Sequence, residues 1–241
     1  MKTLVVLDFD HTVIDDNSDT WVIKCTPEQA LPYGLQNTYE KGKWTEYMGR
    51  IFSYIGDLGI KEGAIRSVME TVPYTDGMIE LLRFISENKE TLDCIIISDA
   101  NTLFIEWILH AADMHCAIDK IFTNPAYFDD RGYLTVRCFH SHTCTQCPVN
   151  LCKRKVLQSF IERQLTDGVK YQRVIYVGDG RNDFCPTNCL KQCDVVMPRK
   201  GFALDKIISE VNFKKCEHLN PRVVPWTSGA DIIHYIQFNI K

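Results

Sequence analysis

Residues 4–12 read Leu-Val-Val-Leu-Asp-Phe-Asp-His-Thr, an apolar run that leads directly into two carboxylates one residue apart. A short, continuous, Val-rich run is typical of a parallel-sheet strand that is covered on both faces. Ligands bind such sheets at the carboxyl ends of the strands, where Asp8 and Asp10 lie. Because side chains alternate along an extended chain, Asp8 and Asp10 are expected to face the same side. Alone, the pair is also compatible with a solvated acidic turn.

Two neighbouring carboxylates repel each other and resist burial unless a positive charge offsets them. Mg²⁺ prefers oxygen ligands and keeps coordination positions for water or for substrate phosphate. The pair therefore favours a Mg²⁺ site that includes Asp8 and Asp10.

Composition places the chain among ordinary globular proteins. It has 241 residues, of which 45% are hydrophobic and 24% charged, and its net charge of −4 gives no basic footprint for nucleic acid. We find no run of 18 apolar residues and no secretory leader, so we expect a cytoplasmic protein without a membrane partner. The 11 cysteines are an odd number, and in a reducing compartment we interpret them as thiols.

About 60 residues separate the first strand from the next, far more than a plain crossover connection needs. Within this segment Trp44, Met48, Ile51 and Phe52 recur at the three- and four-residue steps of an amphipathic helix. We therefore expect a catalytic core made of residues 1–14 and 74–241, with a helical cap at 15–73 inserted after the first strand. Such a cap would cover the carboxyl end of that strand and exclude water.

The rest of the chain alternates apolar runs with helical patterns, which indicates an α/β fold with a parallel sheet. Further strands are expected at 92–98, 121–123, 173–177 and 194–197, a β-hairpin at 127–136, helices at 102–110 and 155–163, an edge strand at 223–226, and a last helix after Ser228.

Polar groups follow these runs where each one stops. Ser98 ends the second strand, Lys153 lies at the start of a helix, and Asp179 and Asp183 follow the fourth strand within Gly-Asp-Gly-Arg-Asn-Asp. The Ser98 hydroxyl and the Lys153 ammonium suit the binding of phosphate oxygens. Asp179 fits a metal ligand, and Asp183 a ligand or an anchor behind the ligands.

Together these groups favour phosphoryl transfer, which needs a nucleophile, a cation and donors for the equatorial oxygens. Asp8 suits the nucleophile that forms an aspartyl phosphate. Asp10 suits the general acid and base that protonates the leaving oxygen and then activates water.

At these residues the chain resembles the haloacid dehalogenase superfamily of phosphatases. Its motifs match D-x-D-x-T at 8–12, the serine at Ser98, the lysine at Lys153 and G-D-x-x-x-D at 178–183. The resemblance implies a Rossmannoid three-layer core with an all-helical C1 cap. The motif lysine is assigned to Lys153, because residues 153–157 resemble K-x-x-x-L, while Lys155 stays a competitor.

Within this superfamily the chain resembles the PHOSPHO group, whose branches act on phosphoethanolamine and phosphocholine or on pyridoxal phosphate. The chain's length favours the second branch. The resemblance implies Mg²⁺ dependence and substrate contacts at Asp19 and Asp99, and two extra acids favour a substrate with a cationic end. Asp19 can equally be a first-turn helix acid. A clamp by Arg50 would favour phosphoserine instead. The expected partner is a small phosphate ester, and no protein partner is implied.

A stretch rich in cysteine and histidine precedes Lys153, and Cys144-Thr145-Gln146-Cys147 has the spacing of a zinc knuckle or a redox pair. Because a second C-x-x-C pair is missing, we favour a loop of packed thiols. The alternative outside enzymes is a zinc-binding interaction module with a silent phosphatase core, which predicts bound zinc and no hydrolysis.

Overall fold

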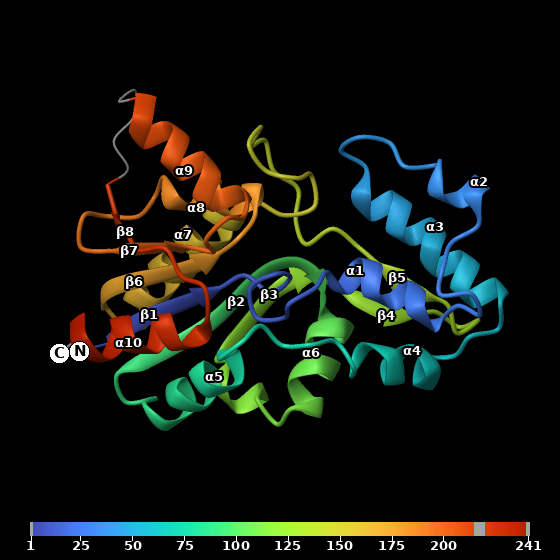
Figure 1. Ribbon diagram of the computed structural model, residues 1–241, viewed down its shortest axis with the longest axis horizontal. Helices are drawn as coiled ribbons and strands as arrows, with labels where there is room; N and C mark the ends of the chain where they lie inside the picture. The colour runs from blue at the N-terminus through green and yellow to red at the C-terminus, as the bar shows by residue number, and fades with distance from the viewer. Residues whose placement is uncertain (1, 215–219, 240–241) are drawn as a thin grey trace.

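The computed structural model describes residues 2–214 and 220–239, and within them six strands form one sheet in the order β3-β2-β1-β6-β7-β8 (Figure 1). Each neighbouring pair in this sheet is parallel. The strands are β1 (Lys2–Leu7), β2 (Leu92–Asn101), β3 (Lys120–Asn124), β6 (Tyr171–Gly178), β7 (Val195–Pro198) and β8 (Arg222–Val223). Because β1 lies between β2 and β6, the carboxyl ends of these three strands meet at one edge of the sheet.

The alternation of side chains along β1 builds the two sides of the core. Leu4 and Val6 belong to a cluster with residues of α7 and α9, whereas Val5 and Leu7 belong to a larger cluster with residues of α5, α6 and α10. These helices are α5 (Met78–Glu87), α6 (Thr102–Ala111), α7 (Lys153–Thr166), α9 (Ala203–Lys214) and α10 (Gly229–Asn239). Figure 1 shows them on opposite faces of the sheet. The predicted three-layer α/β architecture is confirmed.

Short helices lie between β1 and β2, as the sequence predicts. Before α5 they are α1 (Ser18–Trp21), a 3-10 helix (Val22–Cys25), α2 (Tyr33–Gln36), α3 (Trp44–Asp57) and α4 (Glu62–Met69). The apolar face of α3 is buried at Met48, Ile51, Phe52 and Ile55. The Phe52 ring meets Phe104 of α6 edge to face at 6.0 Å. The core of this helical insertion is therefore continuous with the larger core cluster of the sheet.

The predicted hairpin is formed by β4 (Ala126–Phe128) and β5 (Leu134–Val136), which pair antiparallel. In Figure 1 it lies beside α3, and the Tyr133 hydroxyl donates to Asp57 Oδ1 at 2.8 Å. The hairpin, which the expected division places in 74–241, thus packs against the insertion at 15–73. The division into core and cap stays a prediction.

The remaining short elements lie around the strand ends. They are two 3-10 helices (His115–Ala117 and Arg181–Asp183) and α8 (Phe184–Thr187). Among the residues described, no helix combines the length and the apolar character that crossing a bilayer requires. The cysteines of the described part of the chain are free thiols.

Candidate active site

A buried ammonium lies between two carboxylates at the carboxyl edge of the sheet. Lys153 Nζ is 2.7 Å from Asp8 Oδ1 and 2.8 Å from Asp183 Oδ1. All three side chains are buried, whereas Lys155 is exposed on the same helix. Burial alone would lower the pKa of Lys153, but the charges of Asp183 and Asp8 outweigh it and raise that pKa. The structure therefore brings Lys153, and not Lys155, to Asp8 as a permanent cation.

The Asp183 carboxylate is held from four directions. Its Oδ1 accepts from Lys153 Nζ and from the Tyr176 hydroxyl, both at 2.8 Å. Its Oδ2 accepts from the backbone N–H groups of Asp179 at 3.1 Å and Gly180 at 2.9 Å. A carboxylate has about four lone-pair positions, so these donors use its capacity. This arrangement suits an anchor that fixes Lys153 and the loop after β6.

Gly178 is required where the loop leaves β6. A Cβ at this position would lie 2.5 Å from Asp183 Cγ, a distance that no real side chain tolerates. The missing side chain lets the Asp183 carboxylate reach the backbone of its own loop.

Asp8 and Asp179 are the carboxylates that could hold a divalent ion, beside Asp183, whose oxygens already accept four hydrogen bonds. Oxygen atoms of Asp8, Asp179 and Asp183 all lie within 4.8 Å of one another, and all three residues are buried. Burial and then the nearby Asp183 charge raise the pKa of Asp8, and the same two causes raise that of Asp179 to about 7. One ammonium cannot balance three carboxylates, and an all-oxygen donor set suits Mg²⁺. The residues therefore fit the predicted cation.

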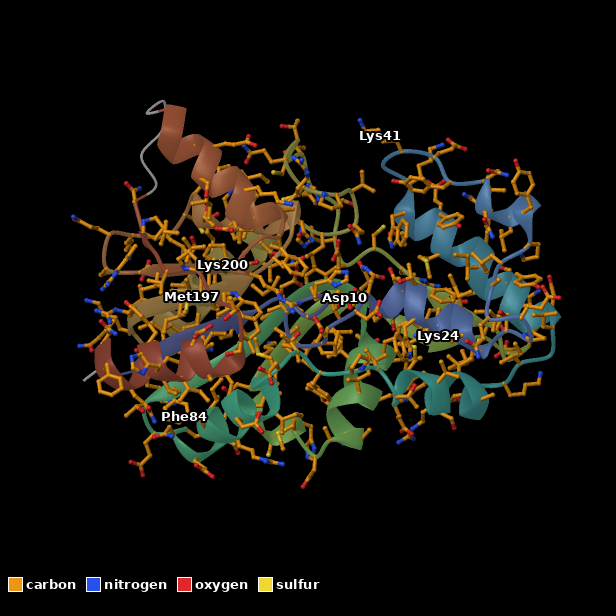
Figure 2. All side chains as sticks on the ribbon, viewed as in Figure 1. Asp10, Lys24, Lys41, Phe84, Met197 and Lys200 are labelled. Atoms are coloured by element: carbon orange, nitrogen blue, oxygen red, sulfur yellow. The ribbon has the colours of Figure 1, made fainter. Side chains whose placement is uncertain are left out.

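Asp10 lies where the sheet edge meets α1 (Figure 2), but its carboxylate is turned to another partner. Ser18 donates to it twice, from its backbone N–H at 3.0 Å and from its hydroxyl at 3.2 Å. Burial and then the Asp19 charge raise the pKa of Asp10, and the Ser18 hydrogen bonds oppose them. A carboxyl group that keeps its proton suits acid and base work. Any contact of Asp10 with the cation would use its backbone carbonyl.

A small pocket beside this cluster is lined by residues of both the insertion and the sheet. It is lined by Asp19, Trp44, Phe52, Asp99 and Val136 among others, and its cavity volume is only about 10 Å³. The Trp44 indole N–H donates to Asp19 Oδ2 at 2.7 Å. Burial raises the pKa of Asp19 to about 7, with the Trp44 hydrogen bond opposing and the Asp99 charge adding to it. The structure thus brings the two predicted substrate acids to one pocket.

Ser98 and Asp99 lie at an irregularity near the end of β2. The pairing with β3 shifts register between Ile97 and Asn101, and Asn124 Nδ2 donates to the Asp99 carbonyl at 2.7 Å. The Ser98 side chain is buried, and its Oγ accepts from the Ala100 N–H at 3.2 Å. Burial is the largest cause of the raised pKa of Asp8 and of Asp10, and the Asp99 charge is a smaller cause of both. Its field therefore reaches both parts of the site.

Comparison with known proteins decides the family. The family model described as Putative Phosphatase matches residues 3–240. A pyridoxal phosphate phosphatase, PHOSPHO2, from Bos taurus is 53% identical over the whole of both chains. The phosphoethanolamine/phosphocholine phosphatase of Gallus gallus is 42% identical, covering 100% of this chain and 90% of its own. The chain belongs to this phosphatase family.

The solved structure of a phosphoserine phosphatase in its apo form shares the fold of this phosphatase. It superposes with a TM-score of 0.62 at 13% identity and covers 98% of this chain and 99% of its own. The predicted haloacid dehalogenase-like fold and the resemblance to the PHOSPHO group are confirmed. The chain is a phosphoric monoester hydrolase, so the silent core in the non-enzyme alternative is wrong.

Sequence reasoning missed the residues that orient the site of this phosphatase. Each of them donates a hydrogen bond to a site residue: Ser18 to Asp10, Trp44 to Asp19, Tyr176 to Asp183, and Asn124 of β3 to the Asp99 carbonyl of β2. Tyr176 was hidden in an apolar strand, and Ser18 resembled only a helix start. Arg50, considered as a clamp, instead donates to the Thr38 hydroxyl and carbonyl within the insertion.

Proposed function

We propose that this phosphatase hydrolyses a small phosphomonoester in two steps through an aspartyl phosphate on Asp8. The observation that carries the proposal is the Lys153 ammonium, buried between Asp8 and Asp183 beside a third carboxylate. Asp8 is thereby aligned without a solvent shell and close to a cation. Mg²⁺, held by Asp8, Asp179 and a main-chain oxygen of Asp10, would neutralise the approaching phosphate charge.

In the first step Asp8 attacks phosphorus through Oδ2, because its contacts with Lys153 Nζ and the Phe9 N–H both fall on Oδ1. The bond between phosphorus and the alcohol oxygen breaks, and the proton held by Asp10 passes to that oxygen. Burial, followed by the Asp19 charge, raises the pKa of Asp10 and so favours the form that holds this proton. An alcohol leaves, and Asp10 becomes a carboxylate.

In the second step Asp10 takes a proton from water, and the water oxygen attacks phosphorus. The bond to Asp8 breaks, which releases inorganic phosphate and restores both acids. Throughout, Lys153 and Ser98 bind the equatorial phosphate oxygens, and Asp183 keeps Lys153 in place.

We infer that the substrate has a cationic group, with pyridoxal phosphate first. Asp19 and Asp99 supply negative charge in the pocket, and Trp44 supplies an aromatic face for a pyridinium or an amine. Relatives named for pyridoxal phosphate are 51–53% identical to this chain. Phosphoethanolamine, phosphocholine and phosphoserine are the alternatives. Small-molecule pockets measure about 300–1,000 Å³ and this cavity only about 10 Å³, so we infer that the insertion moves outward when substrate enters.

We also propose a cytoplasmic location, which free thiols in the described part of the chain support because a reducing compartment preserves them. Fractionation of cells that express the tagged chain would test it.

The experiment that tests the function replaces Asp8. With Mg²⁺ present, Asp8→Asn should lower turnover of pyridoxal phosphate and of an aryl phosphate by about 10⁴-fold or more, since the nucleophile is lost. Phosphate release is the measurement, on the alternative esters as well. Asp130→Asn, an exposed acid in the hairpin turn, is the matched control and should keep full rate. Full activity of Asp8→Asn would refute the aspartyl phosphate.

A further inference from the structure

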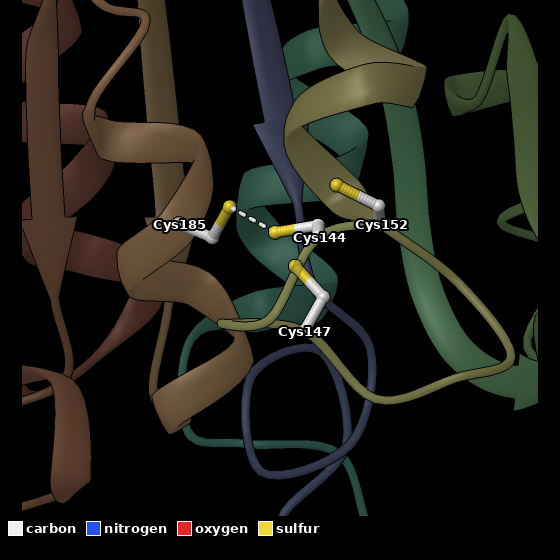
Figure 3. A group of neighbouring side chains, drawn as sticks. All are labelled: Cys144, Cys147, Cys152 and Cys185. Carbon is white, nitrogen blue, oxygen red and sulfur yellow. Dashed lines mark hydrogen bonds between the residues drawn. The ribbon is translucent and has the colours of Figure 1, made fainter. Parts of the chain in front are cut away.

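Four thiols converge outside the carboxylate group. The sulfur atoms of Cys144, Cys147, Cys152 and Cys185 all lie within 4.8 Å of one another. In Figure 3 their side chains point toward a common centre. Cys144 and Cys147 come from the loop after β5, Cys152 immediately precedes α7, and Cys185 lies in α8. The fourth thiol, which a C-x-x-C pattern could not reveal, is supplied by an element distant in sequence.

The spacing fits a tetrahedral metal ion. With Zn–S bonds of about 2.3 Å, the corners of a tetrahedron are about 3.8 Å apart. Cys144 and Cys185 Sγ are 3.6 Å apart, far beyond the length of a disulfide bond of about 2.05 Å. Sulfurs around an iron–sulfur cluster stand farther apart, because inorganic sulfide and several irons fill the space between them.

The loop at 137–152 has no helix or strand of its own. Structureless loops longer than about 12–15 residues are uncommon in compact domains unless something holds them. Most of this loop is exposed or half-buried, Val149 is 63% exposed, and Leu151 is one of its few buried apolar side chains. Apolar burial alone therefore gives this loop little reason to keep one shape.

The two histidines of the loop are already engaged with its backbone. The Cys152 N–H donates to His140 Nε2 at 3.2 Å, and the Cys144 N–H donates to His142 Nδ1 at 3.2 Å. The other nitrogen of His142 contacts the Pro148 carbonyl at 2.7 Å. They orient the backbone of two cysteines, which is the role that residues behind metal ligands play.

We propose that Cys144, Cys147, Cys152 and Cys185 form a structural zinc site with four thiolate ligands. Zn²⁺ displaces the protons that the thiols still hold, which go to solvent, and four sulfurs close the coordination sphere. No ligand position is left for water, so the site has no hydrolytic role. It ties the loop and α8 to the start of α7.

The position of this site gives it a second effect, which rests on the proposed function. Cys152 immediately precedes Lys153, and Cys185 lies two residues after Asp183. The ion would thus fix both ends of the Lys153–Asp183 ion pair from outside. We infer that it positions Lys153, without touching substrate.

The test begins with the metal content of the full-length protein, purified without chelator. Elemental analysis should find about one zinc per chain, retained after dialysis against a chelator that removes Mg²⁺. A mercurial reagent that blocks thiols should release it. Cobalt-loaded protein should show the visible bands and the sulfur-to-metal charge-transfer band of a tetrahedral thiolate site.

Variants assign the ligands. Cys147→Ser should lose most of the zinc, whereas Cys138→Ser, an exposed thiol of the same loop outside the cluster, should keep it. Should Cys147→Ser fail to fold, the cobalt spectrum of the unmodified chain still decides. Absence of zinc, iron in its place, or a disulfide among the four cysteines would overturn the proposal. A zinc-loaded chain without phosphatase activity would contradict only the proposed mechanism.

Discussion

The carboxylate group and the thiol cluster both adjoin the start of α7, the first through Lys153 and the second through Cys152, and they differ in almost every physical respect. Asp8, Asp179 and Asp183 offer hard oxygen atoms, one of which is also the proposed nucleophile. Cys144, Cys147, Cys152 and Cys185 offer soft sulfur atoms, and four such ligands leave no coordination position for water or substrate. The first group suits an exchangeable ion that leaves room for substrate, and the second suits an ion that stays.

The two regions also differ in how they affect the stability of the fold before a metal ion binds. Buried carboxylates in excess of their single ammonium destabilise the fold until a cation binds, which is expected where function requires charge. The thiols carry little such charge: the hydrogen bond with Cys147 lowers the pKa of Cys185 to about 6, whereas the pKa values of Cys147 and Cys152 are raised. The three predictions that follow would break or sharpen this contrast.

The largest effect is expected at Lys153, which contacts Asp8 and Asp183 of the first region and directly follows Cys152 of the second. Lys153→Met should lower kcat/KM on an aryl phosphate by about 10²–10³-fold, since a donor to the developing charge is lost. It should also lower the free energy of unfolding by about 3–5 kcal/mol, because Asp8 and Asp183 lose their partner. Lys155→Met, on the exposed face of the same helix, should change neither. The reverse pattern would identify Lys155 as the phosphate-binding lysine.

The next effect concerns pH. Burial raises the pKa of Asp179 from 3.8 in the unfolded chain to about 7 in the folded chain. The buried carboxyl group therefore does not lower the free energy of unfolding below pH 3.8, and it lowers that free energy most above pH 7. Without Mg²⁺, stability should therefore fall as pH rises from 5.5 to 8, by about 2 kcal/mol from this group at 1.36 kcal/mol per unit.

Asp179→Asn should flatten that part of the profile and weaken the stabilisation by Mg²⁺, as urea unfolding at each pH would show. The thiol site should have the opposite dependence, because acid returns protons to sulfur and releases zinc. If the pH profile of unfolding of this variant matches that of the unmodified chain, Asp179 does not cause the loss of stability at higher pH.

The smallest effect is expected at the substrate pocket. Asp19→Asn should raise KM for pyridoxal phosphate by about tenfold, equivalent to about 1.4 kcal/mol, through loss of attraction for the cationic end. KM for an aryl phosphate that has no cationic group should hardly change. Glu28→Gln, an exposed acid on the same insertion, serves as control. Equal changes for both substrates would make Asp19 a structural acid of α1.

The sequence by itself determined the parallel sheet, the helical insertion and the order of the acids, because these depend on local periodicity and on short motifs. The apolar run before Asp8 predicted a buried strand, and the step pattern of α3 predicted its inward face. Lys153 was found as one of two neighbours, since a lysine pattern does not show which side chain enters the core.

The tertiary structure alone decided which side chains meet across elements. Ser18, Trp44 and Tyr176 look like ordinary helix or strand residues until packing brings them to Asp10, Asp19 and Asp183. Cys185 joins the thiols of a distant loop for the same reason. Periodicity along the chain specifies the face on which a residue lies, but its contacts depend on how the layers pack against one another.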